Sequence, residues 1–153
     1  MLLIAHRGNI HGPNPERENH PSYVDEAIRA GFDVEVDLQV FGRHIYLGHD
    51  DYLHEVGANF ILFRRNNLWV HCKNHEAAEL MYALRNSRIK WFVHDEQPDV
   101  LVENSNFKWH HSTNLNFEKN SICVLPEKNK LDKSTLMDKV AGICSDYVSD
   151  YKK

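Results

Sequence analysis

Short apolar runs alternate along the chain with segments that have the period of a helix. The apolar runs are strand candidates, and the segments between them place hydrophobic residues on one helical face. Gly31 and Asn74 stand where a helix would end and where the next would begin. The strand candidates are 2–6, 32–40, 44–49, 68–73, 90–95, 107–112, 121–127 and 141–148. The helix candidates are 21–31, 74–86, 96–104 and 133–142.

This alternation predicts βαβ units and a parallel sheet, with one antiparallel hairpin over 38–49. Polar or ionisable residues close nearly every apolar run, and in a parallel α/β barrel such strand ends form the active-site face. These closing residues are His6, Glu35, Asp37, His71, Lys73, His94, Asp95, His110, His111, Glu127 and Asp146. An open doubly wound sheet would instead gather them near one crevice.

We therefore predict an α/β fold of the TIM-type (β/α) barrel, formed as a single phosphodiesterase-like domain over 1–153. A full barrel takes about 250 residues, and the chain has 153. Connections such as 50–67 and 112–120 are too short or too irregular for full helices. The expected barrel is consequently reduced in size, with several helices shortened or missing.

Composition narrows the classes of function. The chain is 42% hydrophobic and 26% charged, with a net charge of −4 and scattered Lys and Arg, which argues against nucleic acid as a partner. It has no run of the ~20 apolar residues that a membrane span needs. The opening MLLIA has no basic region before it, so we interpret it as mature structure and not as a signal peptide. Three widely spaced cysteines in apolar runs predict buried, reduced thiols and a cytoplasmic protein. Eleven histidines favour a metal or acid–base site.

The first 50 residues hold the strongest candidate chemistry. Glu35 and Asp37 are two apart on a strand, so both side chains point to one face, and a divalent cation would relieve their repulsion. His6 and His49 can divide proton removal and proton donation. Basic groups at Arg7 and Lys73 can bind phosphate. Together these residues predict metal-assisted cleavage of a phosphodiester.

These motifs also resemble a known family. HRG (6–8), EN (18–19), GFDVEVDL (31–38) and HD (49–50) are similar to the signature of glycerophosphodiester phosphodiesterases, in the phosphatidylinositol-phospholipase-C-like superfamily. The resemblance is specific over 4–50 and weaker at LWVHCK (68–73) and GICSDYV (142–148). Over 75–140 it extends only to the alternation of strand and helix segments.

The resemblance implies the role of each residue. His6 and His49 would be the acid–base pair, Glu35 and Asp37 would bind the metal, and Arg7 and Lys73 would hold the phosphate. The substrate would be a small or lipid-derived phosphodiester, foremost a glycerophosphodiester that yields an alcohol and glycerol phosphate. A hydroxyl of the substrate can itself attack phosphorus in that family. Glu18 and Asn19 would support the metal or the start of the helix.

One departure from the family pattern concerns the metal. His71 stands where the family has a third metal carboxylate, so we expect a site of lower negative charge. Mg²⁺ or Ca²⁺ is the first expectation, and Mn²⁺ or Zn²⁺ becomes an option through His71. Glu127, Asp95 or Asp146 would be the alternative third ligand.

Purely structural interpretations remain open for the individual motifs. Glu35 and Asp37 can be a solvated strand face, His49 can merely close a hairpin, and His71 can be a core histidine. At the level of function, one alternative is a binding protein that keeps the phosphate pocket without turnover. Another is a phospholipase that acts at membrane surfaces. The sequence leaves the oligomeric state open.

Overall fold

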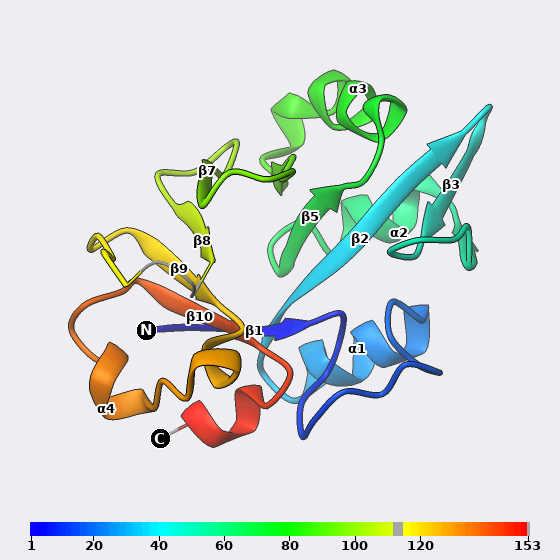
Figure 1. Cartoon of the computed structure of the whole chain (residues 1–153). Coiled ribbons are helices and arrows are strands. Elements are labelled where there is room, and N and C mark those ends of the chain that lie inside the picture. Colours follow the sequence, from blue (N-terminus) through cyan, green and yellow to red (C-terminus); the bar gives the residue numbers. More distant parts are fainter. Residues whose placement is uncertain (112–114, 153) are drawn as a thin grey trace.

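The computed structural model describes residues 1–111 and 115–152, and it is dominated by one mixed sheet of ten strands. Figure 1 shows the sheet curling so that β1 lies at its centre, between β2 and β10. The strands are β1 (Leu2–His6), β2 (Asp33–Phe41), β3 (His44–Leu47), β4 (His54–Val56), β5 (Leu68–Cys72), β6 (Lys90–Phe92), β7 (Asp99–Leu101), β8 (Lys108–His111), β9 (Ser121–Val124) and β10 (Gly142–Ser145).

The helices of the described residues are short. The α-helices are α1 (Pro21–Arg29), α2 (Ala58–Phe63), α3 (His75–Ala83) and α4 (Lys133–Leu136). Three 3₁₀ turns follow α3, β9 and β10, at η1 (Arg85–Ser87), η2 (Pro126–Asn129) and η3 (Val148–Tyr151). The predicted caps are present. Gly31 follows the end of α1 and has a φ of +87°. At the start of α3, the Asn74 side chain accepts a hydrogen bond from the Ala77 N–H.

Parallel pairing runs through most of the sheet. Strands β6, β5, β2, β1, β10, β9 and β8 pair side by side in parallel, in that order. The remaining pairs are antiparallel. They join β2 to β3, as the hairpin over 38–49 predicted, and also β3 to β4 and β7 to β8. Parallel strands share one carboxyl-terminal edge, so their ends meet on one side of the sheet.

The prediction of a TIM-type barrel is wrong. The chain forms a curled, mixed half-barrel sheet with many strands and four short helices, in place of regular strand–helix alternation, in the part that the structure describes. The physical reason is strand pairing after β6. There the chain forms the antiparallel hairpin of β7 and β8 in place of a helical crossover.

Two of the predicted helices differ most from the structure. Segment 96–104 contains strand β7, where apolar residues end in a turn at Asn104 with a φ of +61°. Segment 133–142 is helical only over α4, because Met137 is extended and Asp138 has a φ of +67°. Strand β4 and helix α2 lie within the connection 50–67. Residue 112, the last of the predicted run 107–112, lies outside the described residues.

The two faces of the sheet have different chemistry. On β2, Val34, Val36 and Leu38 are buried in the core cluster that also holds residues of α1, α2 and α3. Side chains alternate along a strand, so Glu35 and Asp37 point to the opposite, inner face. Apolar residues of the other strands fill the lower part of that face, namely Ile4, Trp69, Phe92, Trp109, Ile122 and Cys144. The inner face thus carries apolar side chains in its lower part and ionisable side chains near the carboxyl ends of the strands.

The pairing of the first strand with the last gives a test of this fold. A Cβ at Gly142 would lie 2.7 Å from the Cβ of Leu2 and 2.9 Å from its carbonyl oxygen. We expect Gly142→Ala to lower the free energy of unfolding by about 1–3 kcal/mol, the usual cost of overpacking. The control is Gly57→Ala, whose Cβ meets nothing within 4 Å. Equal stability of the two variants in urea unfolding would contradict the close pairing of β1 with β10.

Candidate functional site

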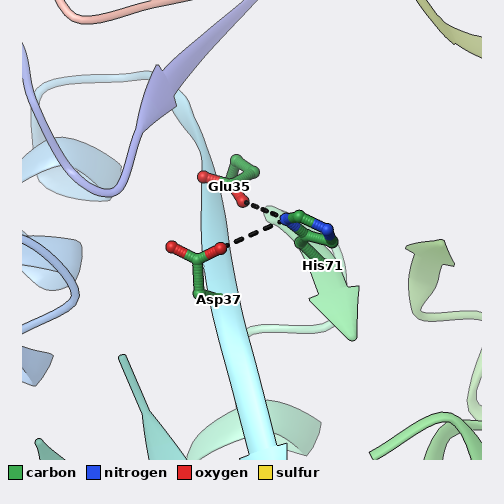
Figure 2. Close-up of side chains that lie close together, drawn as sticks. All are labelled: Glu35, Asp37 and His71. Atoms are coloured by element: carbon green, nitrogen blue, oxygen red, sulfur yellow. Dashed lines mark ion pairs between the residues drawn. The ribbon is translucent and has the colours of Figure 1, made fainter. Parts of the chain in front are cut away.

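Strand register brings a carboxylate pair and a histidine together. In the parallel ladder of β2 and β5, Asp37 is the register partner of His71. The Nδ1 atom of His71 lies 3.1 Å from Oδ1 of Asp37 and 3.8 Å from Oε1 of Glu35. Figure 2 shows both carboxylates approaching this one ring nitrogen. Both carboxylates are buried, which excludes the solvated strand face.

Polar residues from the loop after β1 hold Asp37. Its Oδ2 lies 2.9 Å from Nε of Arg7 and accepts a hydrogen bond of 3.0 Å from the side-chain amide of Asn19. The Asn19 amide oxygen in turn accepts the backbone N–H of Asp37 at 2.9 Å. Arg7 also pairs with Glu18 at 3.2 Å. Glu18 and Asn19, the residues of the EN motif, therefore contact Arg7 and Asp37 of the candidate site.

The two carboxyl groups have opposite pKa shifts. Burial and the charge of Asp37 raise the pKa of Glu35. Burial acts in the same sense on Asp37, but His71 and Arg7 outweigh it and lower the pKa of Asp37. An environment that moves the pKa values of two neighbouring carboxyl groups in opposite directions is typical of functional sites.

The donor set fits a divalent cation. One ligand atom from each of Glu35, Asp37 and His71 lies within 4.8 Å of the others. Asp37 Oδ1 is buried and accepts no hydrogen bond, because the His71 ring approaches it without hydrogen-bond alignment. A buried carboxylate oxygen without a donor is costly, and a cation would satisfy it. Two carboxylates and one imidazole suit Mn²⁺ or Zn²⁺ as well as Mg²⁺.

Two of the three alternative third ligands, Glu127 and Asp146, are engaged elsewhere, and Asp95 lies outside the close group of ligand atoms. Glu127 accepts the Ser145 hydroxyl and the backbone N–H of Asp146, each at 2.9 Å. Asp146 binds His6. Among the described residues, the group of three ligands consists of Glu35, Asp37 and His71.

His6 forms a dyad with Asp146, which directly follows the last strand of the sheet. The ring Nδ1 lies 2.7 Å from Oδ1 of Asp146, and Nε2 lies 4.0 Å from Glu35. Asn9 fixes the dyad by donating to Asp146 at 2.8 Å and to Glu18 at 2.9 Å. Burial alone would lower the pKa of His6, but the hydrogen bond to Asp146 and the charge of Glu35 raise it overall. The ring therefore holds its second proton to higher pH than an ordinary histidine.

His49 forms a second dyad on the loop after β3. Its Nδ1 lies 2.7 Å from Asp50, and its Nε2 lies 3.2 Å from Nζ of Lys73. The side chain of Gln39 donates to the carbonyl oxygens of Gly48, His49 and Asp51, which ties this loop to β2. His49 thus has contacts beyond those needed to close a hairpin.

One pocket of about 430 Å³ collects these groups. It is lined by six of the seven residues that the sequence predicts for the site: His6, Arg7, Glu35, His49, His71 and Lys73. Asp37 is fully buried behind this lining. The opposite wall carries His94, Asp95, His111 and Lys128, from the ends of β6, β8 and β9. Neighbouring strands thus deliver ionisable groups to one cavity although the sheet is not a regular barrel.

Sequence reasoning did not find the partners of several residues of the site. Asn9 is fully buried and connects two carboxylates, but a lone asparagine after HRG gives no signal in one sequence. Asp146 closes the last apolar run, and that position was the available signal for its role beside His6. The rings of His94 and His111 lie with their centroids 4.1 Å apart, a contact between distant segments.

No family model, curated protein or solved structure matches the chain. The three cysteines are free and buried, as predicted. Across the described residues, none of the helices has the length and apolar character needed to cross a bilayer.

The His6–Asp146 dyad makes a prediction about titration. Asp146→Asn removes the charge that raises the pKa of His6, so burial should dominate and that pKa should fall below the ordinary value of 6.5. In the wild type, the charged pair stabilises the fold below pH 6.5 and its contribution disappears as pH rises through the raised pKa of His6. Imidazole NMR titration measures both values. A His6 pKa that is unchanged by Asp146→Asn would contradict the dyad.

The carboxylate group makes a prediction about metal binding. Glu35→Gln removes an anionic ligand, so Mn²⁺ affinity at pH 7 should fall by about 10- to 100-fold in calorimetric titration. Thermal stability without metal should be unchanged or higher, because the variant also removes repulsion between buried carboxylates. Glu16→Gln, at an exposed acidic residue, is the matched control. Wild-type affinity in Glu35→Gln would exclude this group as the cation site.

Proposed function

We propose that the protein is a metal-dependent phosphodiesterase that hydrolyses a small phosphodiester, foremost a glycerophosphodiester. The supporting observation is that two aspartate-bound histidines line one pocket beside a buried Glu–Asp–His group. The similarity of HRG, EN, GFDVEVDL and HD to glycerophosphodiester phosphodiesterases supports the substrate class. The products would be an alcohol and glycerol phosphate.

We assign His6 as the general acid. Asp146 accepts from Nδ1, so Nε2 is left to face the pocket. The raised pKa favours the protonated form of this ring to higher pH than in an ordinary histidine. His6 would give this proton to the oxygen of the leaving alcohol as its bond to phosphorus breaks.

We assign His49 as the general base. Lysine has only donors, so Nε2 of His49 accepts from Lys73 and carries a lone pair. The Nδ1–H then donates to Asp50. When the phosphate engages Lys73, the lone pair of Nε2 can take a proton from the attacking water or substrate hydroxyl.

Lys73 and Arg7 have different places in this proposal. Lys73 holds no carboxylate partner among the described residues, and we assign it to the phosphate. Arg7 already pairs with Asp37 and Glu18, so its main part is to neutralise the buried carboxylates and to present the rest of its guanidinium to the pocket. A divalent cation held by Glu35, Asp37 and His71 would polarise a phosphoryl oxygen and stabilise the charge that develops on it.

The cytoplasm is the compartment that we propose. Its support is the set of free, buried thiols at Cys72, Cys123 and Cys144, which is typical of proteins from a reducing compartment.

Activity of histidine variants tests the mechanism. With Mg²⁺ or Mn²⁺ present, the wild type should hydrolyse glycerophosphodiesters and chromogenic phosphodiesters. His6→Ala and His49→Ala should each lose about 10²- to 10⁴-fold in kcat, the usual contribution of a general acid or base. His75→Ala is the control, because the His75 side chain is 83% exposed on α3. Circular dichroism checks that each variant folds. Normal hydrolysis by both pocket variants would refute the proposed mechanism.

A phosphate-binding protein without turnover is the second candidate function. The observation in its favour is His71, which stands beside Asp37 where the family that the motifs resemble has a third metal carboxylate, so the candidate cation site carries less negative charge. Binding of a phosphodiester without its hydrolysis, in the presence of Mg²⁺, Mn²⁺, Ca²⁺ or Zn²⁺, would favour this candidate.

A further inference from the structure

The wall of the pocket opposite His6 carries a histidine pair that the proposed function does not use. His94 follows β6 and His111 ends β8, and their ring centroids are 4.1 Å apart with the planes tilted by 33°. The ring of His71 lies 6.3 Å from that of His94, nearly perpendicular to it. Three imidazoles from three strand ends therefore lie along one side of the cavity.

Backbone contact sets the tautomer of His94. Its Nε2 lies 2.7 Å from the carbonyl oxygen of Gln97, and a carbonyl only accepts, so this nitrogen carries the hydrogen. A neutral His94 then has its lone pair on Nδ1. Metal-binding histidines are typically fixed in this way, with the second ring nitrogen donating to a carbonyl or carboxylate.

The surroundings lower the pKa of both rings, which favours the neutral form. Burial, followed by the neighbouring rings and Lys128, lowers the pKa of His111 to about 4. Burial and the nearby charges of His71 and Lys73 also lower the pKa of His94, against the opposing effect of Asp95 and Gln97. Neutral imidazole is the ligand form of histidine.

The second ring nitrogen of His71, Nε2, is a further feature of this wall. Nε2 lies on the side of the ring away from the two carboxylates, as Figure 2 shows, and it is buried without a hydrogen-bond partner. A buried polar atom without a partner is uncommon in a folded protein.

We propose that His94 and His111 bind a second divalent ion of the zinc class, next to the Glu35–Asp37–His71 group. Nitrogen donors favour Zn²⁺, Ni²⁺ and Cu²⁺ over Mg²⁺ and Ca²⁺, so the two groups would select different ions. The described residues give this wall no three ligand atoms as close together as those of the carboxylate group. We therefore assign two protein ligands, and water or phosphate oxygens take the other positions. Ion binding is independent of hydrolysis, whereas a role in clamping the phosphate rests on the proposed function.

Zinc titration in the absence of substrate tests this site. The probe is Zn²⁺ alone, measured by calorimetry on the wild type, on Glu35→Gln, and on the double variant His94→Ala/His111→Ala. We expect Glu35→Gln to keep one zinc site. The double histidine variant should lose that site, with affinity at least about tenfold weaker. The matched control removes two histidines from outside the pocket, His11→Ala/His75→Ala, and should bind zinc as the wild type does.

Imidazole NMR of the wild type provides a readout that needs no variant to fold. Zinc should shift the ring signals of His94 and His111 even when Mg²⁺ is in excess. The proposal is overturned if those signals do not move, or if the double variant binds zinc like the control while Glu35→Gln loses all binding. Neither outcome depends on turnover, so failure of this site is distinguishable from failure of the phosphodiesterase proposal.

Discussion

The burial of two carboxylates side by side on β2 is the constraint on which the site depends. Glu35 and Asp37 point to the same inner face, where neither can be hydrated, so their charges need partners from other elements. Arg7 and Asn19 come from the loop after β1, and His71 comes from the neighbouring strand β5. Even with these partners, Asp37 Oδ1 accepts no hydrogen bond. The proposed cation would satisfy this oxygen, and the need to compensate the two buried carboxylates accounts for the polar residues that gather here from distant parts of the chain.

The same constraint extends outward to the two histidine dyads. Glu35 contributes to the raised pKa of His6, which Asp146 and Asn9 hold in place. On the other side, the loop of His49 is tied to β2 through Gln39, two residues beyond Asp37. One strand therefore carries the carboxylates and positions the segment that brings the second histidine. The acid and base of the proposed reaction are arranged around β2 and its neighbours.

Much of the fold and of the candidate site could be predicted from local sequence patterns. The predictions that failed have identifiable physical causes. The runs at 2–6 and 32–40 become strands because apolar alternation and the Glu-x-Asp spacing act within a few residues. The barrel prediction failed because helical periodicity over 96–104 gave way to hairpin pairing with β8, which depends on tertiary contacts. The partnership of His6 with Asp146 spans 140 positions and could not be deduced from one sequence. The contact between His94 and His111 was unpredictable for the same reason, since only the curl of the sheet brings their rings together.

The central claim is that Glu35, Asp37 and His71 surround one divalent cation, and locating that cation tests it most directly. Crystals soaked in Mn²⁺ and measured for anomalous scattering at the manganese edge would show where the ion lies. The account predicts a peak within bonding distance of a carboxylate oxygen of Glu35, a carboxylate oxygen of Asp37 and a ring nitrogen of His71. It would be contradicted if manganese occupied only surface carboxylates while His71 kept its direct approach to Asp37.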